Sequence, residues 1–307
     1  MKIGLLYSRI RKDEKLLLEE LRERDHTVEK IDVRRARFGL AEPPAGFAGI
    51  DILVDRCLAT SRSRYATRFA DAYGVPVVNS AETARVCADK VENSLALSAA
   101  GVPTPTTEVA FTKDTALEII EDFGYPCVLK PVIGSWGRLM AKIDSRTAAE
   151  AILEHKETLG HYEHKVFYIQ EFVDKPGRDI RVVATDGDPV AAMVRSSDHW
   201  LTNAAKGAET AGFDLDAEAR DLVARASEAV GGGLLGVDLM EVGGTRRASG
   251  SSGERETGVD TAGYTVHEVN HTVEFKALND ATDVDVPARV VDWLEQRAGA
   301  ETVEGEA

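Results

Sequence analysis

Short apolar runs alternate with longer amphipathic stretches through the first part of the chain. Four of these runs are predicted as β-strands, at residues 2–7, 27–33, 51–54 and 75–78. Apolar residues at helical spacing predict helices between them, near residues 12–25 and 61–73. Strands that alternate with helices in this way are typical of an open, doubly wound sheet. We therefore predict an N-terminal α/β domain over residues 1–88.

The pattern beyond residue 88 predicts two further domains of mixed α and β structure, over residues 89–171 and 172–298. The second of these opens with two strands joined by a turn at Gly187. Segment 243–263 is rich in Gly, Ser and Thr, so we expect a mobile hairpin loop there, and 299–307 reads as a polar tail. The predicted strands in these domains are 179–185 and 189–195, and the predicted helices are 112–123, 147–159 and 216–231.

Composition narrows the possible functions. The chain has 307 residues and a formal charge of −15, from 52 acidic against 37 basic side chains. Nucleic-acid binding generally needs a basic surface, so no nucleic-acid partner is expected. No apolar stretch is long enough to span a bilayer, and the N-terminus lacks the apolar segment of a signal peptide. We expect a cytoplasmic protein, with Cys57, Cys87 and Cys127 as core residues.

Basic residues are concentrated near the N-terminus. Residues 1–70 contain 15 Lys and Arg against 11 Asp and Glu, although the whole chain is acidic. This group is either a solvated face or a docking surface for an acidic partner. The excess comes largely from Arg34, Arg35, Arg37, Arg56, Arg62, Arg64 and Arg68.

Lys130 marks the first candidate site. It ends an apolar strand, and a glycine-interrupted loop from Gly134 to Arg138 follows. The ammonium, the exposed main-chain N–H groups beside glycine and the Arg138 guanidinium could together bind phosphates. The alternative is an ordinary hairpin with a glycine-rich turn.

Three oxygen-bearing side chains form the second candidate site. Glu268 and Asn270 alternate on one face of a predicted strand, and a neighbouring antiparallel strand can bring Asp238 alongside. Carboxylate and amide oxygens suit magnesium, which takes further ligands from phosphates and water. The alternative is a surface hairpin with solvated acids. Apolar neighbours of Asp238 argue against it, because a half-buried carboxylate needs a partner.

These residues carry a resemblance that covers nearly the whole chain. The motifs Lys90, Lys130-Pro, Gly134-Ser-Trp-Gly-Arg138, Gln170-Glu-Phe-Val173, Arg178-Asp-Ile-Arg181, Asp238 and Glu268-Val-Asn270 resemble the ATP-grasp ligases, in particular the LysX/ArgX/RimK group. The loop and Glu268-Val-Asn-His-Thr-Val-Glu-Phe275 are most similar to ligases that act on the carrier protein LysW. The resemblance implies an ATP-grasp fold with a pre-ATP-grasp N-terminal domain.

The resemblance also implies roles for the nucleotide site. Lys90 and Lys130 would bind the ATP phosphates, with Lys130 counted as catalytic, and Asp179, Arg181 and Asn203 would complete the site. Asp238, Glu268 and Asn270 would bind magnesium, with Glu268 bridging two ions. The closing loop would be Gly134, Ser135, Trp136, Gly137 and Arg138, and the adenine hinge would be Gln170, Glu171, Phe172 and Val173.

Substrate positions follow from the same resemblance. Arg195 would clamp a substrate carboxylate, beside Ala204, Ala205, Glu274, Phe275, Lys276, Ala277 and Leu278. At 277–278 the α-aminoadipate enzymes of the group carry Asn and a small polar residue, and the glutamate enzymes carry Gly-Phe. Ala277-Leu278 is nearer the second pattern, so glutamate is the expected substrate. His267 and His271 flank the metal strand, but alternation predicts that both point away from Glu268 and Asn270.

The implied activity is an ATP-dependent carboxylate–amine ligation. It would join the amino group of glutamate, or of α-aminoadipate, to the C-terminal glutamate side chain of LysW through an acyl phosphate, in arginine or lysine biosynthesis. Two alternatives stay open: a RimK-like enzyme that adds glutamate to a protein tail, and a non-catalytic ATP-binding regulatory protein. The family commonly forms homo-oligomers.

Overall fold

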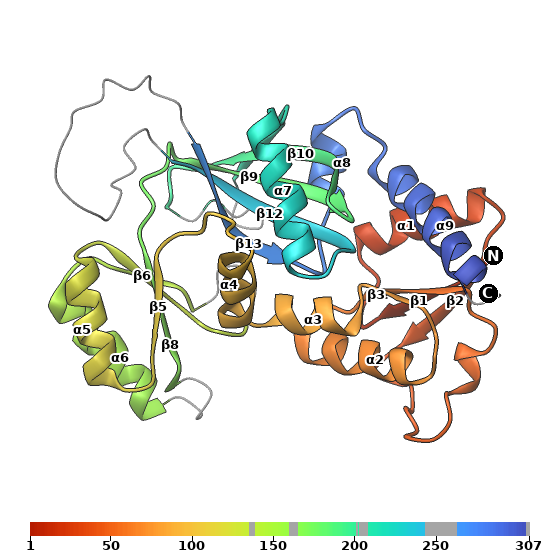
Figure 1. The fold of residues 1–307 in the computed structure, drawn as a ribbon, viewed down its shortest axis with the longest axis horizontal. Coiled ribbons are helices and arrows are strands. Elements are labelled where there is room, and N and C mark those ends of the chain that lie inside the picture. The colour runs from red at the N-terminus through yellow and green to blue at the C-terminus, as the bar shows by residue number, and fades with distance from the viewer. Residues whose placement is uncertain (135–138, 160–164, 201, 203–207, 243–262, 305–307) are drawn as a thin grey trace.

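The computed structural model describes residues 1–134, 139–159, 165–200, 202, 208–242 and 263–304. Three β-sheets with flanking helices make up the molecule (Figure 1). The N-terminal sheet is parallel in the order β2-β1-β3-β4, and it confirms the predicted doubly wound unit. Its strands are β1 (Lys2–Tyr7), β2 (Thr27–Asp32), β3 (Ile52–Arg56) and β4 (Val77–Val78), with helices α1 (Lys12–Glu23), α2 (Thr60–Ala72) and α3 (Ala81–Ala88). Helix α4 (Lys90–Ala99) follows and contacts α7 and β13 of the third sheet.

A small antiparallel sheet follows, in the order β5-β8-β6-β7. The apolar side chains of its helices pack on one face, where Ile120, Leu129, Leu153 and Ile169 are fully buried. Burial of such side chains is the main force that holds the sheet and helices together. The elements are β5 (Thr107–Ala110), α5 (Lys113–Phe123), β6 (Cys127–Lys130), β7 (Ala141–Ile143), α6 (Arg146–Leu159) and β8 (Phe167–Glu171).

The third sheet is antiparallel, in the order β11-β10-β9-β12-β13. It places β13 at one edge, and α7 covers one face (Figure 1). The elements are β9 (Arg178–Thr185), β10 (Asp188–Ser196), β11 (Glu209–Gly212), α7 (Ala217–Ala229), β12 (Leu234–Val242), β13 (Gly263–Asn270), α8 (Lys276–Ala281) and α9 (Val286–Glu304). The predicted hairpin of β9 and β10 is confirmed, and its turn contains Gly187 with φ +90°.

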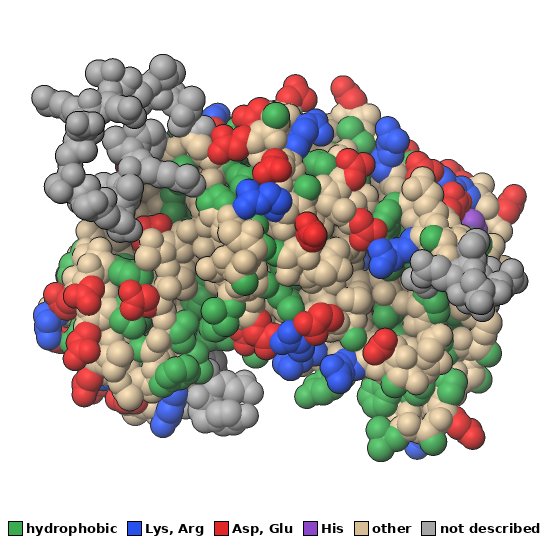
Figure 2. All heavy atoms as spheres, viewed as in Figure 1, with side chains coloured by type: hydrophobic (Ala, Val, Ile, Leu, Met, Phe, Trp, Pro, Cys, Tyr) green, Lys and Arg blue, Asp and Glu red, His purple; other side chains and the backbone are tan. Residues whose placement is uncertain are grey.

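The last helix returns to the first domain. Leu17 and Leu21 of α1 belong to one buried cluster with Val290 and Leu294 of α9. Arg24, just after α1, adds ion pairs to Asp292 at 2.6 Å and Glu295 at 3.2 Å. The N-terminal sheet is therefore joined to the C-terminal part of the chain by a shared core. Among the described residues, no helix has the length and apolarity needed to cross a membrane. On the face of the molecule shown in Figure 2, acidic and basic side chains lie interspersed.

Candidate active site

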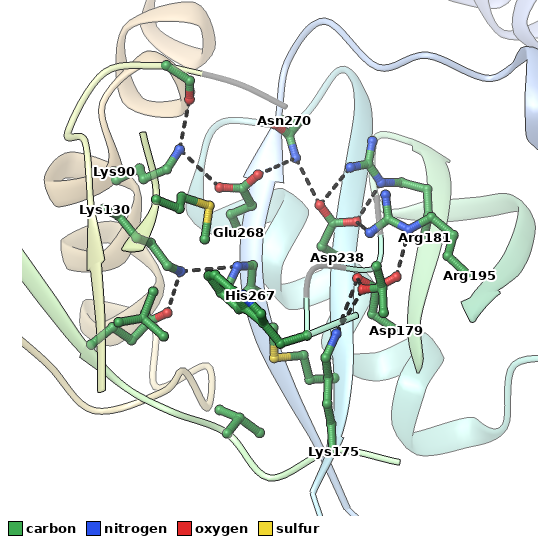
Figure 3. Close-up of a pocket in the computed structure, with 18 of the residues that line it drawn as sticks. Lys90, Lys130, Lys175, Asp179, Arg181, Arg195, Asp238, His267, Glu268 and Asn270 are labelled. Carbon is green, nitrogen blue, oxygen red and sulfur yellow. Dashed lines mark hydrogen bonds and ion pairs between the residues drawn. The ribbon is translucent and has the colours of Figure 1, made fainter. Parts of the chain in front are cut away.

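A cavity of about 390 Å³ lies between the small sheet and the third sheet. Figure 3 shows its side chains converging from β6, β9, β12 and β13 and from the start of α4. Part of its wall is apolar and consists of Val128, Met140, Phe172, Met193, Trp200 and Met240. Cationic and acidic groups occupy the remainder. A cavity with an apolar wall and a few convergent charges is the usual form of a small-molecule site.

Two lysines face the acidic groups from the side of the small sheet. Lys130, at the end of β6, is 2 % exposed, and its Nζ lies 3.1 Å from His267 Nε2 and donates to Gln170 Oε1. Burial lowers the pKa of Lys130 to about 7, against the opposing attraction of Glu268. Lys90, in the first turn of α4, lies 3.2 Å from Glu268 Oε2. Both lysines thus line the cavity, with Lys90 directed at Glu268 and Lys130 at His267 and Gln170.

The three predicted oxygen donors come together as the strand pattern required. Asp238 of β12 is paired with Glu268 of β13, and Gly236 with Asn270. The Asn270 amide nitrogen lies 3.3 Å from Asp238 Oδ2 and 3.3 Å from Glu268 Oε1. Burial would raise the pKa of Glu268, but Lys90 and Lys130 outweigh it and hold that pKa well below its usual range. Glu268 is therefore a carboxylate at neutral pH.

Asp238 is held by two guanidinium groups. Arg181 of β9 donates to both of its oxygens, at 2.5 and 2.7 Å. Arg195 of β10 donates to Asp238 at 2.8 Å and to Asp179 at 2.6 Å. Burial would raise the Asp238 pKa, but Arg181 and Arg195 lower it overall. The guanidinium of Arg195 is thus engaged with two buried carboxylates.

His267 departs from the prediction made by alternation. The pairing of β12 with β13 passes from Asp238–Glu268 directly to Leu239–Val266, so His267 is the extra residue of a β-bulge. A bulge turns a side chain toward the face that alternation would deny it. His267 therefore lines the cavity beside Lys130, and the prediction that it points away is wrong. Burial lowers its pKa to about 3, so the ring is neutral. His271 does point away, toward Ser63.

The donor set fits a hard divalent cation. Two carboxylates and an amide converge, and the hydrogens of the Asn270 amide stand where positive charge is favoured. With the amide turned over, its oxygen would become a third donor at the same point. The cavity beside this set is lined by Lys90, Lys130 and an apolar wall, which suits the phosphates and base of a nucleotide.

Most of the sequence-predicted residues line this one cavity. Those within it are Lys90, Lys130, Gly134, Gln170, Glu171, Phe172, Val173, Asp179, Arg181, Arg195, Asp238, Glu268, Asn270, Glu274, Lys276 and Ala277. Phe275 and Leu278 are fully buried in the core and do not line it, although Ala277 packs against their cluster. Ser135, Trp136, Gly137, Arg138, Asn203, Ala204 and Ala205 lie outside the described residues.

Sequence reasoning missed a chain of alternating charges that leads from the N-terminal domain to the cavity. Arg56 is 1 % exposed and lies 3.1 Å from the buried Glu14. Glu14 accepts from Arg11 at 2.7 Å, and Arg11 in turn donates to Glu274. Arg56 therefore cannot belong to an external docking surface, as the basic cluster of the sequence suggested. No local pattern signals the burial of Arg56, because Glu14 is 42 positions away.

Comparisons with known proteins agree with this geometry. Residues 3–86 match the LysX preATP-grasp domain, and residues 87–246 match the RimK-like ATP-grasp domain. The glutamate–LysW ligase ArgX of Sulfolobus acidocaldarius is 28% identical over 300 residues, which cover 96% of this chain and 98% of the relative. The α-aminoadipate–LysW ligase LysX of Sulfurisphaera tokodaii is 31% identical over 299 residues, with 96% and 99% covered.

A solved structure gives the same result for the fold. The RimK domain ATP-grasp protein from Sphaerobacter thermophilus is 27% identical, with a TM-score of 0.77 over 95% of this chain and 99% of that chain. The two domain matches together span residues 3–246. The chain therefore belongs to the ATP-grasp ligases of the LysX/ArgX/RimK group, which are ATP-dependent, amide-forming enzymes.

Proposed function

We propose that this ligase joins the α-amino group of glutamate to the C-terminal glutamate side chain of a LysW-type carrier protein. The proposal is carried by one observation: two lysines face two carboxylates and an amide across a nucleotide-sized cavity, in a chain whose relatives are named as LysW ligases. The product would be a carrier-bound amino acid with its amine protected. Such a step would open a carrier-bound route to arginine or lysine.

The reaction would proceed in two transfers. The γ-phosphoryl group of ATP passes to an oxygen of the carrier carboxylate, which gives an acyl phosphate and ADP. The glutamate amine then attacks the acyl carbon, loses a proton, and displaces inorganic phosphate as the amide forms. Lys90 and Lys130 would neutralise charge on the transferring group, since Lys90 Nζ lies 3.2 Å from Glu268 and Lys130 Nζ lies beside His267, the residue before it. Magnesium, when bound by Asp238, Glu268 and Asn270, would supply further charge stabilisation, and the resemblance suggests two ions.

The choice of glutamate over α-aminoadipate rests on Ala277, with Leu278 packed behind it. Ala277 lines the cavity with a small, apolar side chain, and Leu278 fills the core behind it. Neither offers a hydrogen bond to a longer side-chain carboxylate, so the pocket should favour the shorter substrate. One methylene is worth only about 1–3 kcal/mol in such discrimination. We therefore expect a preference rather than absolute selection.

The carrier is proposed to approach over α2. Arg62, Arg64 and Arg68 of that helix are exposed, and Thr60 at its start lines a crevice that also contains Lys90 and Glu268. An acidic carrier would be attracted to the three exposed arginines of this helix. The resemblance further suggests a homo-oligomer.

A phosphate-release assay tests this function. The purified ligase is incubated with ATP, magnesium and a LysW-type carrier, and glutamate and α-aminoadipate are added in turn. Release should require both the carrier and the amino acid, and glutamate should be the better substrate. If release instead depends on a protein tail unrelated to LysW, the RimK-like activity is the correct one. If neither the LysW-type carrier nor such a protein tail supports phosphate release, the proposed substrates are wrong.

A further inference from the structure

The strand that carries Glu268 and Asn270 is an edge strand. In the sheet order, β13 follows β12, and no other described strand pairs with its outer side. Main-chain groups on that side therefore need partners from elsewhere. Val266 N–H donates to Pro103 O at 2.8 Å, and His271 O accepts from the Asn79 amide at 2.5 Å. Val269 lies between these two points, and it too is bound by an asparagine side chain.

The side chain of Asn93 takes the place of a neighbouring strand at Val269. Its amide nitrogen donates to Val269 O at 3.0 Å, and its amide oxygen accepts from Val269 N–H at 3.2 Å. Asn93 is 3 % exposed, so both bonds lie away from bulk water. Val269 lies between Glu268 and Asn270 in the strand. The side chains of those two residues point to the other face of the strand from Val269 and enter the site. The amide thus fixes the backbone from which both donors project.

Asn93 lies on the same helix as the phosphate-facing lysine. Lys90 and Asn93 are three residues apart on α4, which places them on neighbouring positions of one helix surface. Lys90 Nζ is 3.2 Å from Glu268 Oε2, one residue from the position that Asn93 holds. The start of α4 is itself fixed, because Asp89 accepts from Val91 N–H at 2.8 Å and from Glu92 N–H at 3.2 Å. Helix α4 therefore positions Lys90 directly, and it positions Glu268 through the two bonds from Asn93 to Val269.

We propose that Asn93 is a positioning residue for the phosphate and metal groups, which it aligns by tying α4 to the backbone of β13. This proposal rests on the metal site assigned above. Partners behind metal ligands commonly change metal affinity or activity by about 10–100-fold when they are removed. The loss expected for Asn93 variants is therefore in metal-dependent nucleotide binding, and the adenine side of the cavity should be unaffected.

The test compares two affinities in the same protein. Dissociation constants for a non-hydrolysable ATP analogue with magnesium, and for AMP without it, are measured by calorimetry. Asn93→Leu removes both hydrogen bonds at nearly constant volume, and Asn93→Ala leaves room for water to satisfy Val269 if the first variant does not fold. Analogue affinity should fall by about tenfold or more, while AMP affinity stays within about twofold.

Two further variants make the result specific. Leu97→Ala creates a cavity under the next turn of α4, where Leu97 is 1 % exposed, and it leaves the amide pair intact. It should lower thermal stability without changing the ratio of analogue affinity to AMP affinity. Glu268→Gln should lower that ratio. If it does and Asn93→Ala does not, or if Leu97→Ala lowers it equally, the positioning role is refuted. If neither Glu268→Gln nor Asn93→Ala lowers it, the metal assignment fails as well.

Discussion

Removal of the Arg195 guanidinium tests how the acidic side of the cavity is stabilised. Arg195→Ala takes away the bond to Asp179 at 2.6 Å and the bond to Asp238 at 2.8 Å. Both carboxylates remain in a buried environment, since Asp179 is 7 % and Asp238 is 4 % exposed. Breaking a buried ion pair from one side generally costs about 3–5 kcal/mol, because the remaining charge is left without compensation.

The structure places the expected effect at the lower end of that range. Asp238 keeps the bidentate contact with Arg181, and Asp179 keeps its hydrogen bond from Thr202. We therefore expect Arg195→Ala to lower the free energy of unfolding by about 3 kcal/mol. Urea denaturation followed by tryptophan fluorescence measures this quantity.

Arg178→Ala is a matched control on the neighbouring strand. Arg178 binds Glu241 through two nitrogens, at 2.6 and 2.8 Å, but its side chain is 43% exposed, against 7% for Arg195. An exposed pair of this kind contributes about 0–1 kcal/mol. Equal losses for the two variants, or a loss below about 1 kcal/mol for Arg195→Ala, would refute the view that burial makes the Arg195 pairs important.

Four further predictions address binding and turnover. Glu268→Gln should abolish most activity without unfolding the protein, and wild-type turnover at saturating ATP and magnesium would contradict the metal assignment. Reversal of Arg62 and Arg64 to Glu should weaken carrier binding more than ATP binding at low salt, whereas unchanged carrier affinity would leave them as solubilising charges. Replacement of Ala277, which lines the cavity, by Asn should shift the ratio of kcat/KM toward α-aminoadipate, and an unchanged ratio would exclude this position from specificity. ATP binding at pH 8 should take up a proton, because the Lys130 pKa of about 7 leaves most Lys130 side chains neutral in the free enzyme, and bound phosphate favours the ammonium form. Calorimetry in two buffers of different ionisation enthalpy detects the uptake, and equal heats in both would refute it.

The sequence was sufficient where a local pattern decides the structure. Alternation along β13 correctly placed Glu268 and Asn270 on one face, with Asp238 opposite on β12. The same rule failed at His267, since a β-bulge adds one residue to the strand and no turn or glycine marks it in the sequence. Local rules cannot locate such an irregularity, which depends on how two strands pair.

Long-range pairs set a second limit on prediction. The basic residues of the N-terminal region were considered as one group, but Arg56 among them is buried against Glu14. Likewise, Leu278 was expected in the substrate pocket and packs in the core with residues of α1 and α9. Each of these contacts joins segments that are far apart in the chain. The division into domains at residues 88 and 171 stays a prediction, and the shared core of α1 and α9 shows how closely the first and last segments are joined.

The most direct test of the proposed function is the intact mass of the carrier after reaction. Purified ligase, LysW-type carrier, ATP, magnesium and glutamate are combined, and ADP and phosphate are quantified in the same sample. The account predicts that the carrier gains the mass of one glutamate residue, with one ADP and one phosphate formed for each, and that Glu268→Gln suppresses all three. A carrier of unchanged mass, with ATP consumed or not, would contradict it.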